Sequence, residues 1–127
     1  SLILTNAGLD EFMARDLFEA LSLNPHNLTS LDLSFIPSTH PSVPRSRGHD
    51  DLMMRQQTTI VGKALRSMNR YLRITNTLAN LNLRATKLGK PGADCISDAF
   101  RKNLLLPDVL SSVDLSCNSR GYEPVSE

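Results

Sequence analysis

A short pattern of leucines alternating with polar residues sets the organisation of the chain. In residues 78–83, LANLNL, leucine occupies the first, fourth and sixth positions. Leu81 and Leu83 are two residues apart, which is the side-chain period of a β-strand, so both can point into one core. The polar residue between them then points to the opposite face. This stretch therefore predicts a strand that is buried on one face only.

A turn and a helix are expected soon after this strand. A Lys-Pro-Gly sequence occupies residues 90–92, and proline is tolerated near the start of a helix. Gly92, Ile96 and Phe100 are four residues apart and share one helical face. Residues 78–103 thus predict a unit made of a strand, a turn and a helix.

The same leucine pattern occurs at three more places. Complete copies occupy 28–33 and 110–115, the latter with valine in place of one leucine, and a truncated copy occupies 2–4. The last leucines of successive copies are 29, 50 and 32 residues apart. The first and third spacings fit the leucine-rich repeat, whose period is roughly 20–29 residues, slightly stretched. The middle spacing indicates an insertion.

These copies predict an α/β fold: a leucine-rich-repeat solenoid of the ribonuclease-inhibitor-like kind, with about three to four repeats and one inserted loop. Residues 1–127 would form a partial leucine-rich-repeat domain, a fragment of a longer protein, because the chain begins inside a strand pattern. Its repeats would occupy about 1–27, 28–76 and 77–108, with an incomplete one at 109–127. We expect parallel strands at 2–5, 30–34, 80–84 and 112–116, and helices near 10–22, 52–70 and 92–103.

The inserted segment is predicted at residues 37–50. It carries three prolines, at positions 37, 41 and 44, and few apolar residues. Such a composition buries too little apolar surface to offset the entropy of ordering, so we expect a disordered insert. It is either a lineage-specific insertion or gene-model error without a role, or a dedicated binding loop.

The helix expected at 52–70 has two contrasting faces. Ile60, Ala64 and Met68 lie on an apolar face. Four cations cluster on the opposite face: Lys63, Arg66, Arg70 and Arg73. They form either an ordinary solvated face or an anion-binding surface for acidic lipid headgroups or an acidic partner.

The residues between the strand leucines would point to the concave face of the solenoid. Aligning the strands places Ile3, Asp32, Asn82 and Asp114 in one row, beside a second row of Thr5, Ser34, Arg84 and Ser116. The candidate partner-binding residues on this face are Asp32, Asn82, Arg84 and Asp114. The alternative to an extended binding surface is a polar face that only keeps the protein in solution.

Asn118 follows the last strand pattern, where such repeats usually carry asparagine. Its amide is expected to satisfy backbone groups in the turn between neighbouring repeats. The equivalent positions are Ala7, Ile36 and Thr86, and of these three only Thr86 has a side chain that can hydrogen-bond.

No catalytic, metal-binding or cofactor-binding constellation is evident in the sequence, so we expect a protein that is not an enzyme and needs no cofactor. His40 and His49, with the adjacent Asp50 and Asp51, lack metal-ligand spacing on a predicted element. The two cysteines, Cys95 and Cys117, are too few for a disulfide framework, and we expect both to be reduced and buried, as in an intracellular protein.

Length and charge add few constraints. A chain of 127 residues permits one domain, and a net charge of +1 requires no nucleic-acid partner. No apolar run approaches the roughly 18–20 residues that span a bilayer. The first residues lack the basic segment of a signal peptide.

Four short stretches carry a family resemblance: Asn6-Ala7-Gly8-Leu9 after a strand, Ala20-Leu21 before Asn24-Pro25, Leu31-Asp32-Leu33-Ser34, and Thr86-Lys87-Leu88 before Gly92. Across 2–34 and 77–118 the chain resembles the leucine-rich-repeat domain of the CARMIL family. Those proteins are large cytoplasmic scaffolds that regulate actin capping protein and link class-I myosin.

The resemblance implies a non-catalytic protein-interaction segment of an actin-regulatory scaffold, acting in filament capping and assembly. It implies a cytoplasmic location with cytoskeletal or plasma-membrane association, protein partners from the cytoskeleton, weak contact with anionic membranes and no nucleic acid. The capping-protein-binding motif and the lipid-binding domain of the family lie outside this stretch, so no functional residue is carried over.

The alternative is a ribonuclease-inhibitor-like repeat protein of another class. One such class is a GTPase activator for the nuclear-transport GTPase, in which an arginine completes a phosphoryl-transfer site. Arg84 and Arg120 are the nearest candidates for that arginine. An innate-immune receptor repeat domain is a further alternative.

Overall fold

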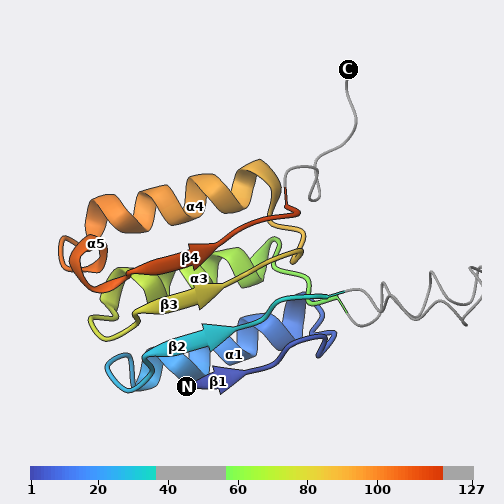
Figure 1. Cartoon of the computed structure of the whole chain (residues 1–127), viewed down its shortest axis with the longest axis horizontal. Coiled ribbons are helices and arrows are strands. Elements are labelled where there is room, and N and C mark those ends of the chain that lie inside the picture. Colours follow the sequence, from blue (N-terminus) through green and yellow to red (C-terminus); the bar gives the residue numbers. More distant parts are fainter. Residues whose placement is uncertain (37–56, 119–127) are drawn as a thin grey trace, which may run out of the picture.

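Four short strands form one sheet in the computed structural model, which describes residues 1–36 and 57–118 (Figure 1). All neighbouring strands are parallel, and their order in the sheet follows their order in the sequence. The strands are β1 (Leu2–Ile3), β2 (Ser30–Asp32), β3 (Asn80–Asn82) and β4 (Ser112–Asp114). In the described residues the helices are α1 (Glu11–Leu23), α3 (Lys63–Ile74), α4 (Gly89–Lys102) and the single turn α5 (Leu106–Val109).

The three long helices cover one face of the sheet, with α3 packed between α1 and α4 (Figure 1). The strand register pairs Leu31 with Leu81, and both side chains are buried. The ladder continues two residues further, where Leu33 N donates to Asn82 O at 2.9 Å and Leu83 N to Asp114 O at 2.8 Å. The alternation of leucine and polar residues therefore directs the leucines towards the helices and leaves the polar residues on the other face.

The helices complete the core with apolar stripes at helical spacing. Ala14 and Phe18 of α1 are fully buried, as are Met68 and Tyr71 of α3. The ring centroids of Phe18 and Tyr71 lie 6.2 Å apart, so the two rings form part of the contact between α1 and α3. Burying a side chain such as Phe18 or Met68 stabilises the fold by about 1.5–3 kcal/mol relative to leaving it exposed. These contacts therefore hold the helices against the sheet.

Gly92 of α4 leaves room for the side chain of Leu88, the residue just before the helix. A Cβ atom at this position would lie 2.4 Å from the Leu88 Cβ atom, and Leu88 is itself buried. The Lys-Pro-Gly sequence, predicted to form a turn before the helix, therefore lies within α4, and the glycine is needed there for close packing. The helix begins at Gly89, three residues before the predicted start, so Pro91 lies within its first turn.

The predicted fold class, a leucine-rich-repeat solenoid, is wrong. The described residues form a small α/β unit with one all-parallel sheet of four strands, and no repeat architecture is evident in them. The leucine pattern reports only that each strand has one buried face, because side chains alternate between the two faces of a strand. In the described residues, α1, α3 and α4 have 13, 12 and 14 residues. Of these three helices, α4 alone is followed by a further helical turn, α5.

The predicted extent of the second helix, 52–70, is also wrong at both ends. Helix α3 runs from Lys63 to Ile74, and residues 57–62 are not helical. These residues are instead bonded to two loops: Thr59 N donates to Leu9 O at 2.7 Å and Ile60 N to Thr86 O at 3.0 Å. The predicted disordered insert, 37–50, lies outside the described residues.

Candidate partner-binding surfaces

The sheet face opposite the long helices, hereafter the open face, is the first candidate surface. None of the described helices covers it (Figure 1). The register pairs Ile3 with Asp32, Asp32 with Asn82, and Asn82 with Asp114. The structure therefore places these four side chains in one row across the strands, at the strand spacing of about 4.8 Å.

Local hydrogen bonds hold the polar members of this row. Asp32 Oδ1 accepts from Ser34 N at 2.9 Å and from Ser34 Oγ at 2.6 Å. Asp114 Oδ1 accepts from Ser116 N and Oγ at the same two distances. These bonds restrict the rotamers of the two carboxylates before any partner arrives, which lowers the entropy lost on binding.

Asn82 and Arg84 link the row to the next one. Asn82 Oδ1 accepts from Arg84 N at 3.1 Å, and the Arg84 guanidinium donates to Ser116 Oγ at 2.9 Å. Hydrogen bonds from Ser116, with the nearby Arg84 charge, lower the pKa of Asp114. All four candidate residues of the open face are thus brought together in the structure.

The structure describes one of the two arginines considered for phosphoryl transfer. Arg84 lies beyond the end of β3, where its side chain is bonded to Ser116 across the strands. Arg120 lies outside the described residues. In the part of the chain that the structure describes, no group of three or more His, Cys, Asp or Glu side chains could hold a metal ion. His40, His49, Asp50 and Asp51 are not among the described residues.

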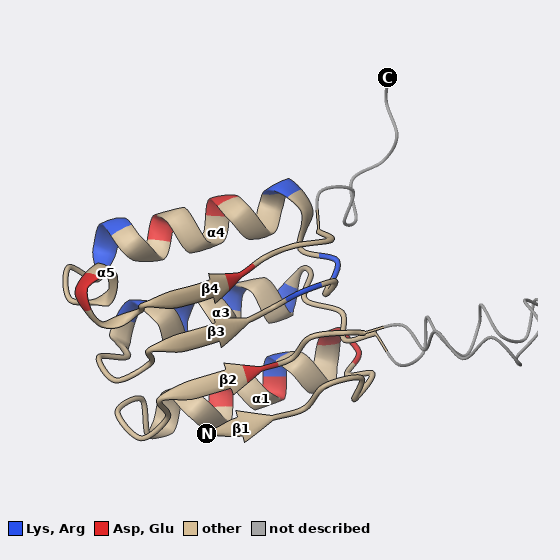
Figure 2. Ribbon diagram, viewed as in Figure 1, with Lys and Arg blue, Asp and Glu red and all other residues tan. Residues whose placement is uncertain are grey.

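The second candidate surface is the outer face of α3, hereafter the basic face, formed by Lys63, Arg66, Arg70 and Arg73 (Figure 2). All four residues are exposed, on the side of the helix opposite its buried residues. Within residues 1–36 and 57–118, no ion pair joins any of them to a carboxylate. The structure therefore keeps the four predicted cations together on one helix.

The cysteines differ from the prediction that both are buried. The Cys95 thiol is partly buried, donates to Leu65 O at 3.2 Å, and has a pKa raised by burial. Cys117 is exposed, because it occupies a turn after the edge strand β4 with φ at +59°. Neither forms a disulfide.

Asn118 performs the predicted structural role. Its Oδ1 accepts from Thr86 N at 2.9 Å and from Leu88 N at 3.1 Å, and its Nδ2 donates to Leu83 O at 2.7 Å. The side-chain amide of Asn118, which follows β4, thus stabilises the turn after β3.

Sequence reasoning missed two other asparagines that join turns in this way. Asn6 exchanges two hydrogen bonds with the backbone of Ile36, at 2.9 and 2.7 Å. The buried Asn103 donates to Leu72 O and Thr75 O at 2.9 and 2.8 Å. The position of each asparagine after the end of a strand or helix is the one signal that could have identified them.

No known family model, no characterised protein sequence and no solved structure matches this chain. The resemblance to CARMIL proteins therefore stays a prediction that rests on the quoted stretches. None of the described helices has the length and apolar character needed to cross a membrane.

Proposed function

We propose that this chain is a non-catalytic protein-interaction segment of an actin-regulatory scaffold, and that it binds a protein partner through the open face. The observation that carries the proposal is the aligned row of Ile3, Asp32, Asn82 and Asp114 on a sheet face that no described helix covers.

The composition of the row suits a protein partner. Ile3 has 67% of its surface exposed and supplies an apolar contact at one end, while the two carboxylates and Asn82 supply hydrogen-bond acceptors along the rest. Arg84 adds a cation beside Asp114. Interfaces typically combine an apolar contact with fixed polar groups that set orientation.

The actin-regulatory part of the proposal is supported by the resemblance to CARMIL alone. From the same resemblance we propose a cytoplasmic location with cytoskeletal association. The binding surface itself does not depend on the repeat architecture or on this resemblance, because the polar row lies on the open face of the observed sheet.

Site-specific photo-crosslinking in cells tests this proposal. A photoreactive amino acid is placed at Asn82 on the open face, or at Ser97, an exposed residue of α4 on the helical side, as the matched control. Proteins linked to each position in the full-length protein are identified by mass spectrometry. We expect actin-regulatory proteins to be linked at position 82 and absent at position 97.

Two outcomes would contradict the proposal. Identical sets of linked proteins at the two positions would remove the open face as the specific surface. A reproducible set at position 82 that contains no cytoskeletal protein would retain the binding surface and reject the actin-regulatory role.

A further inference from the structure

Among residues 1–36 and 57–118, no ion pair neutralises the positive charge on the basic face of α3. On the neighbouring helices, by contrast, Arg15 lies 2.9 Å from Asp16 and Lys102 lies 3.4 Å from Asp98. Helix α3 itself contains no acidic residue. Like charges three and four residues apart destabilise a helix, so a bound counter-charge would relieve this repulsion.

The charge is confined to a narrow strip. A groove of about 240 Å³ between α1 and α3 is lined by Arg15, Glu19, Lys63, Arg66, Ser67 and Arg70. A second groove, of about 600 Å³, lies between α3 and α4, and it combines Arg66, Arg70 and Arg73 with Asp94 and Asp98. Arg66 and Arg70 line both grooves, while carboxylates lie on the far side of each.

This arrangement discriminates between the two anionic partners that the sequence leaves open. A planar membrane resting on the helical layer would approach the carboxylates of α1 and α4 as well as the cations of α3. Figure 2 shows red as well as blue on α1 and α4, whereas the coloured bands on α3 are blue. An extended peptide lying along α3 would meet the cations and leave the flanking carboxylates to solvent.

We infer that the basic face of α3 binds an extended acidic segment of a partner protein. From Lys63 to Arg73 the strip is about 15 Å long at 1.5 Å per helical residue. An extended peptide rises about 3.3 Å per residue, so about five residues span the strip, with carboxylates paired to successive cations.

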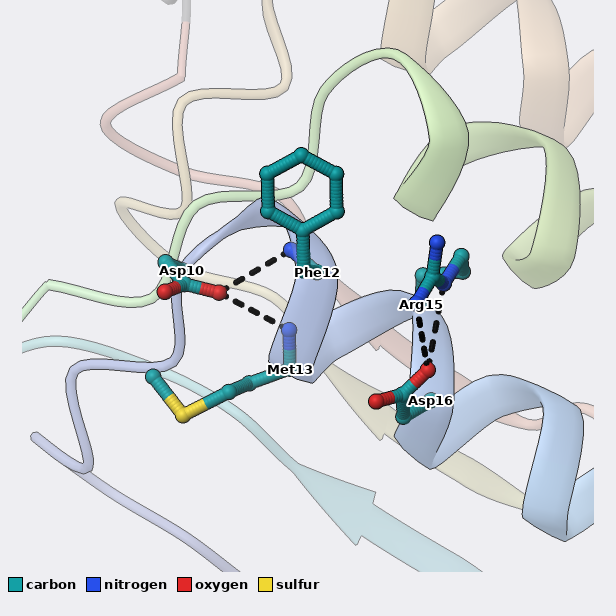
Figure 3. A network of polar contacts seen from close by, with 5 residues as sticks. All are labelled: Asp10, Phe12, Met13, Arg15 and Asp16. Carbon is teal, nitrogen blue, oxygen red and sulfur yellow. Dashed lines mark hydrogen bonds and ion pairs between the residues drawn. The ribbon is translucent and has the colours of Figure 1, made fainter.

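The Lys63 end of the basic face adds an aromatic contact. Phe12 is 51% exposed, and its ring centroid lies 5.5 Å from Lys63 Nζ and 5.4 Å from Arg15 Cζ. Its position in the first turn of α1 is fixed by Asp10, whose carboxylate accepts from Phe12 N and Met13 N (Figure 3). An apolar residue next to the acidic run of the partner would pack on this ring.

The inference is independent of the proposed function, because the basic face lies on the helical layer and the open face on the other side of the sheet. Both surfaces can be occupied at once. Failure of either proposal leaves the other unaffected.

Fluorescence anisotropy with the whole chain tests the inference. The probe is a fluorescein-labelled peptide in which one leucine is followed by six glutamates. The control peptide has glutamine in place of every glutamate. The test variant carries Lys63→Gln, Arg66→Gln, Arg70→Gln and Arg73→Gln. The control variant carries Arg101→Gln and Lys102→Gln, which removes two exposed α4 cations that already have Asp98 as a partner.

We expect the acidic peptide to bind the test variant about tenfold or more weakly than wild type, since exposed ion pairs each contribute modestly. The control variant should bind within about twofold of wild type, because surface changes away from a site have small effects. Rising salt should weaken wild-type binding, and the glutamine peptide should not bind. The double variant Arg66→Gln, Arg70→Gln, with less change to the helix, should show an intermediate loss.

Equal binding of the acidic peptide by wild type and both basic-face variants would overturn the inference. An equal loss of peptide affinity in the α4 control variant would also overturn the inference, because net charge alone would then explain the loss. Wild-type protein that sediments with phosphatidylserine-containing vesicles yet does not bind the peptide would assign the basic face to a membrane and likewise overturn it.

Discussion

Asn103 shows how much of this fold depends on single buried amides. The residue lies after the end of α4, is 8% exposed, and its Nδ2 donates to the last carbonyls of α3. Its Oδ1 accepts from Leu105 N at 3.2 Å. Helix ends leave carbonyls without intrahelical donors, so this side chain satisfies groups that would otherwise be buried without partners.

Replacing Asn103 with aspartate tests this role at nearly constant side-chain volume. A carboxylate cannot donate to Leu72 O and Thr75 O, so we expect Asn103→Asp to lower the free energy of unfolding by about 2–4 kcal/mol. Urea denaturation measures the change. Asn76→Asp, at an exposed position after the end of α3, is the control. A loss no larger than that of the control would show that water replaces the amide.

Asp114 provides a pH-dependent test on the open face. Hydrogen bonds from Ser116 and the Arg84 charge lower the pKa of this carboxyl in the folded state. Because the folded pKa is below the unfolded value of about 3.9, the stabilisation is present above about pH 4 and is lost as pH falls through the folded pKa.

NMR titration should therefore give an Asp114 pKa below that of an unperturbed aspartate. Ser116→Ala removes the hydrogen bond from the Ser116 hydroxyl and should raise the pKa of Asp114 towards the ordinary value. Arg84→Gln should raise it by less. If Ser116→Ala leaves the titration unchanged, the hydrogen bond at 2.6 Å does not persist in solution.

At the scale of the elements, the start of α3 is set by a residue of α1. Glu11 Oε2 accepts from Lys63 N at 2.9 Å, across 52 positions of sequence. Gly62, the residue before the helix, has φ at +51°, and a Cβ atom there would lie 2.4 Å from Glu11 Oε2. A carboxylate at a helix N-terminus satisfies a free amide and interacts favourably with the helix dipole.

Removing this cap should destabilise α3 at its first turn. We expect Glu11→Ala to lower the free energy of unfolding by about 0.5–2 kcal/mol, and to speed amide exchange at Lys63 and the following residues. Glu19→Ala removes the same charge from the exposed side of α1 and should change stability by less than about 0.5 kcal/mol. Equal effects of the two substitutions would mean that charge, and not the cap, is responsible.

The helix starts show where local sequence patterns suffice. The cap of α1 involves neighbouring residues only, because the Asp10 carboxylate accepts from Phe12 N and Met13 N. Helix α3 was predicted to begin near residue 52, because the periodicity of its apolar residues says nothing about a cap donated by α1. Contacts such as the one between Glu11 and Lys63 arise only once the helices pack.

At the scale of the whole molecule, the strand register could be predicted from the sequence, whereas the architecture could not. Alternation around Leu31, Leu81 and Leu83 placed the polar row correctly, because side-chain direction in a strand has a period of two. The same alternation was taken to indicate a solenoid, although it carries no information on whether successive units repeat. Cys117 was predicted to be buried because it lies just past a strand, and its position after the edge strand β4 leaves it exposed.

The open face and the basic face lie on opposite sides of the molecule, so the two proposed partners do not compete for one surface. The open face carries the central claim, and its most direct measurement is the affinity of the full-length protein for the partner linked at position 82. Asn82→Arg places a cation in the middle of the row, and Ser97→Arg places the same charge on the helical side. We predict that Asn82→Arg binds at least about tenfold more weakly while Ser97→Arg binds as wild type does, since disrupting a central contact typically costs more than about 1 kcal/mol. Unchanged affinity in a folded Asn82→Arg protein would contradict the account.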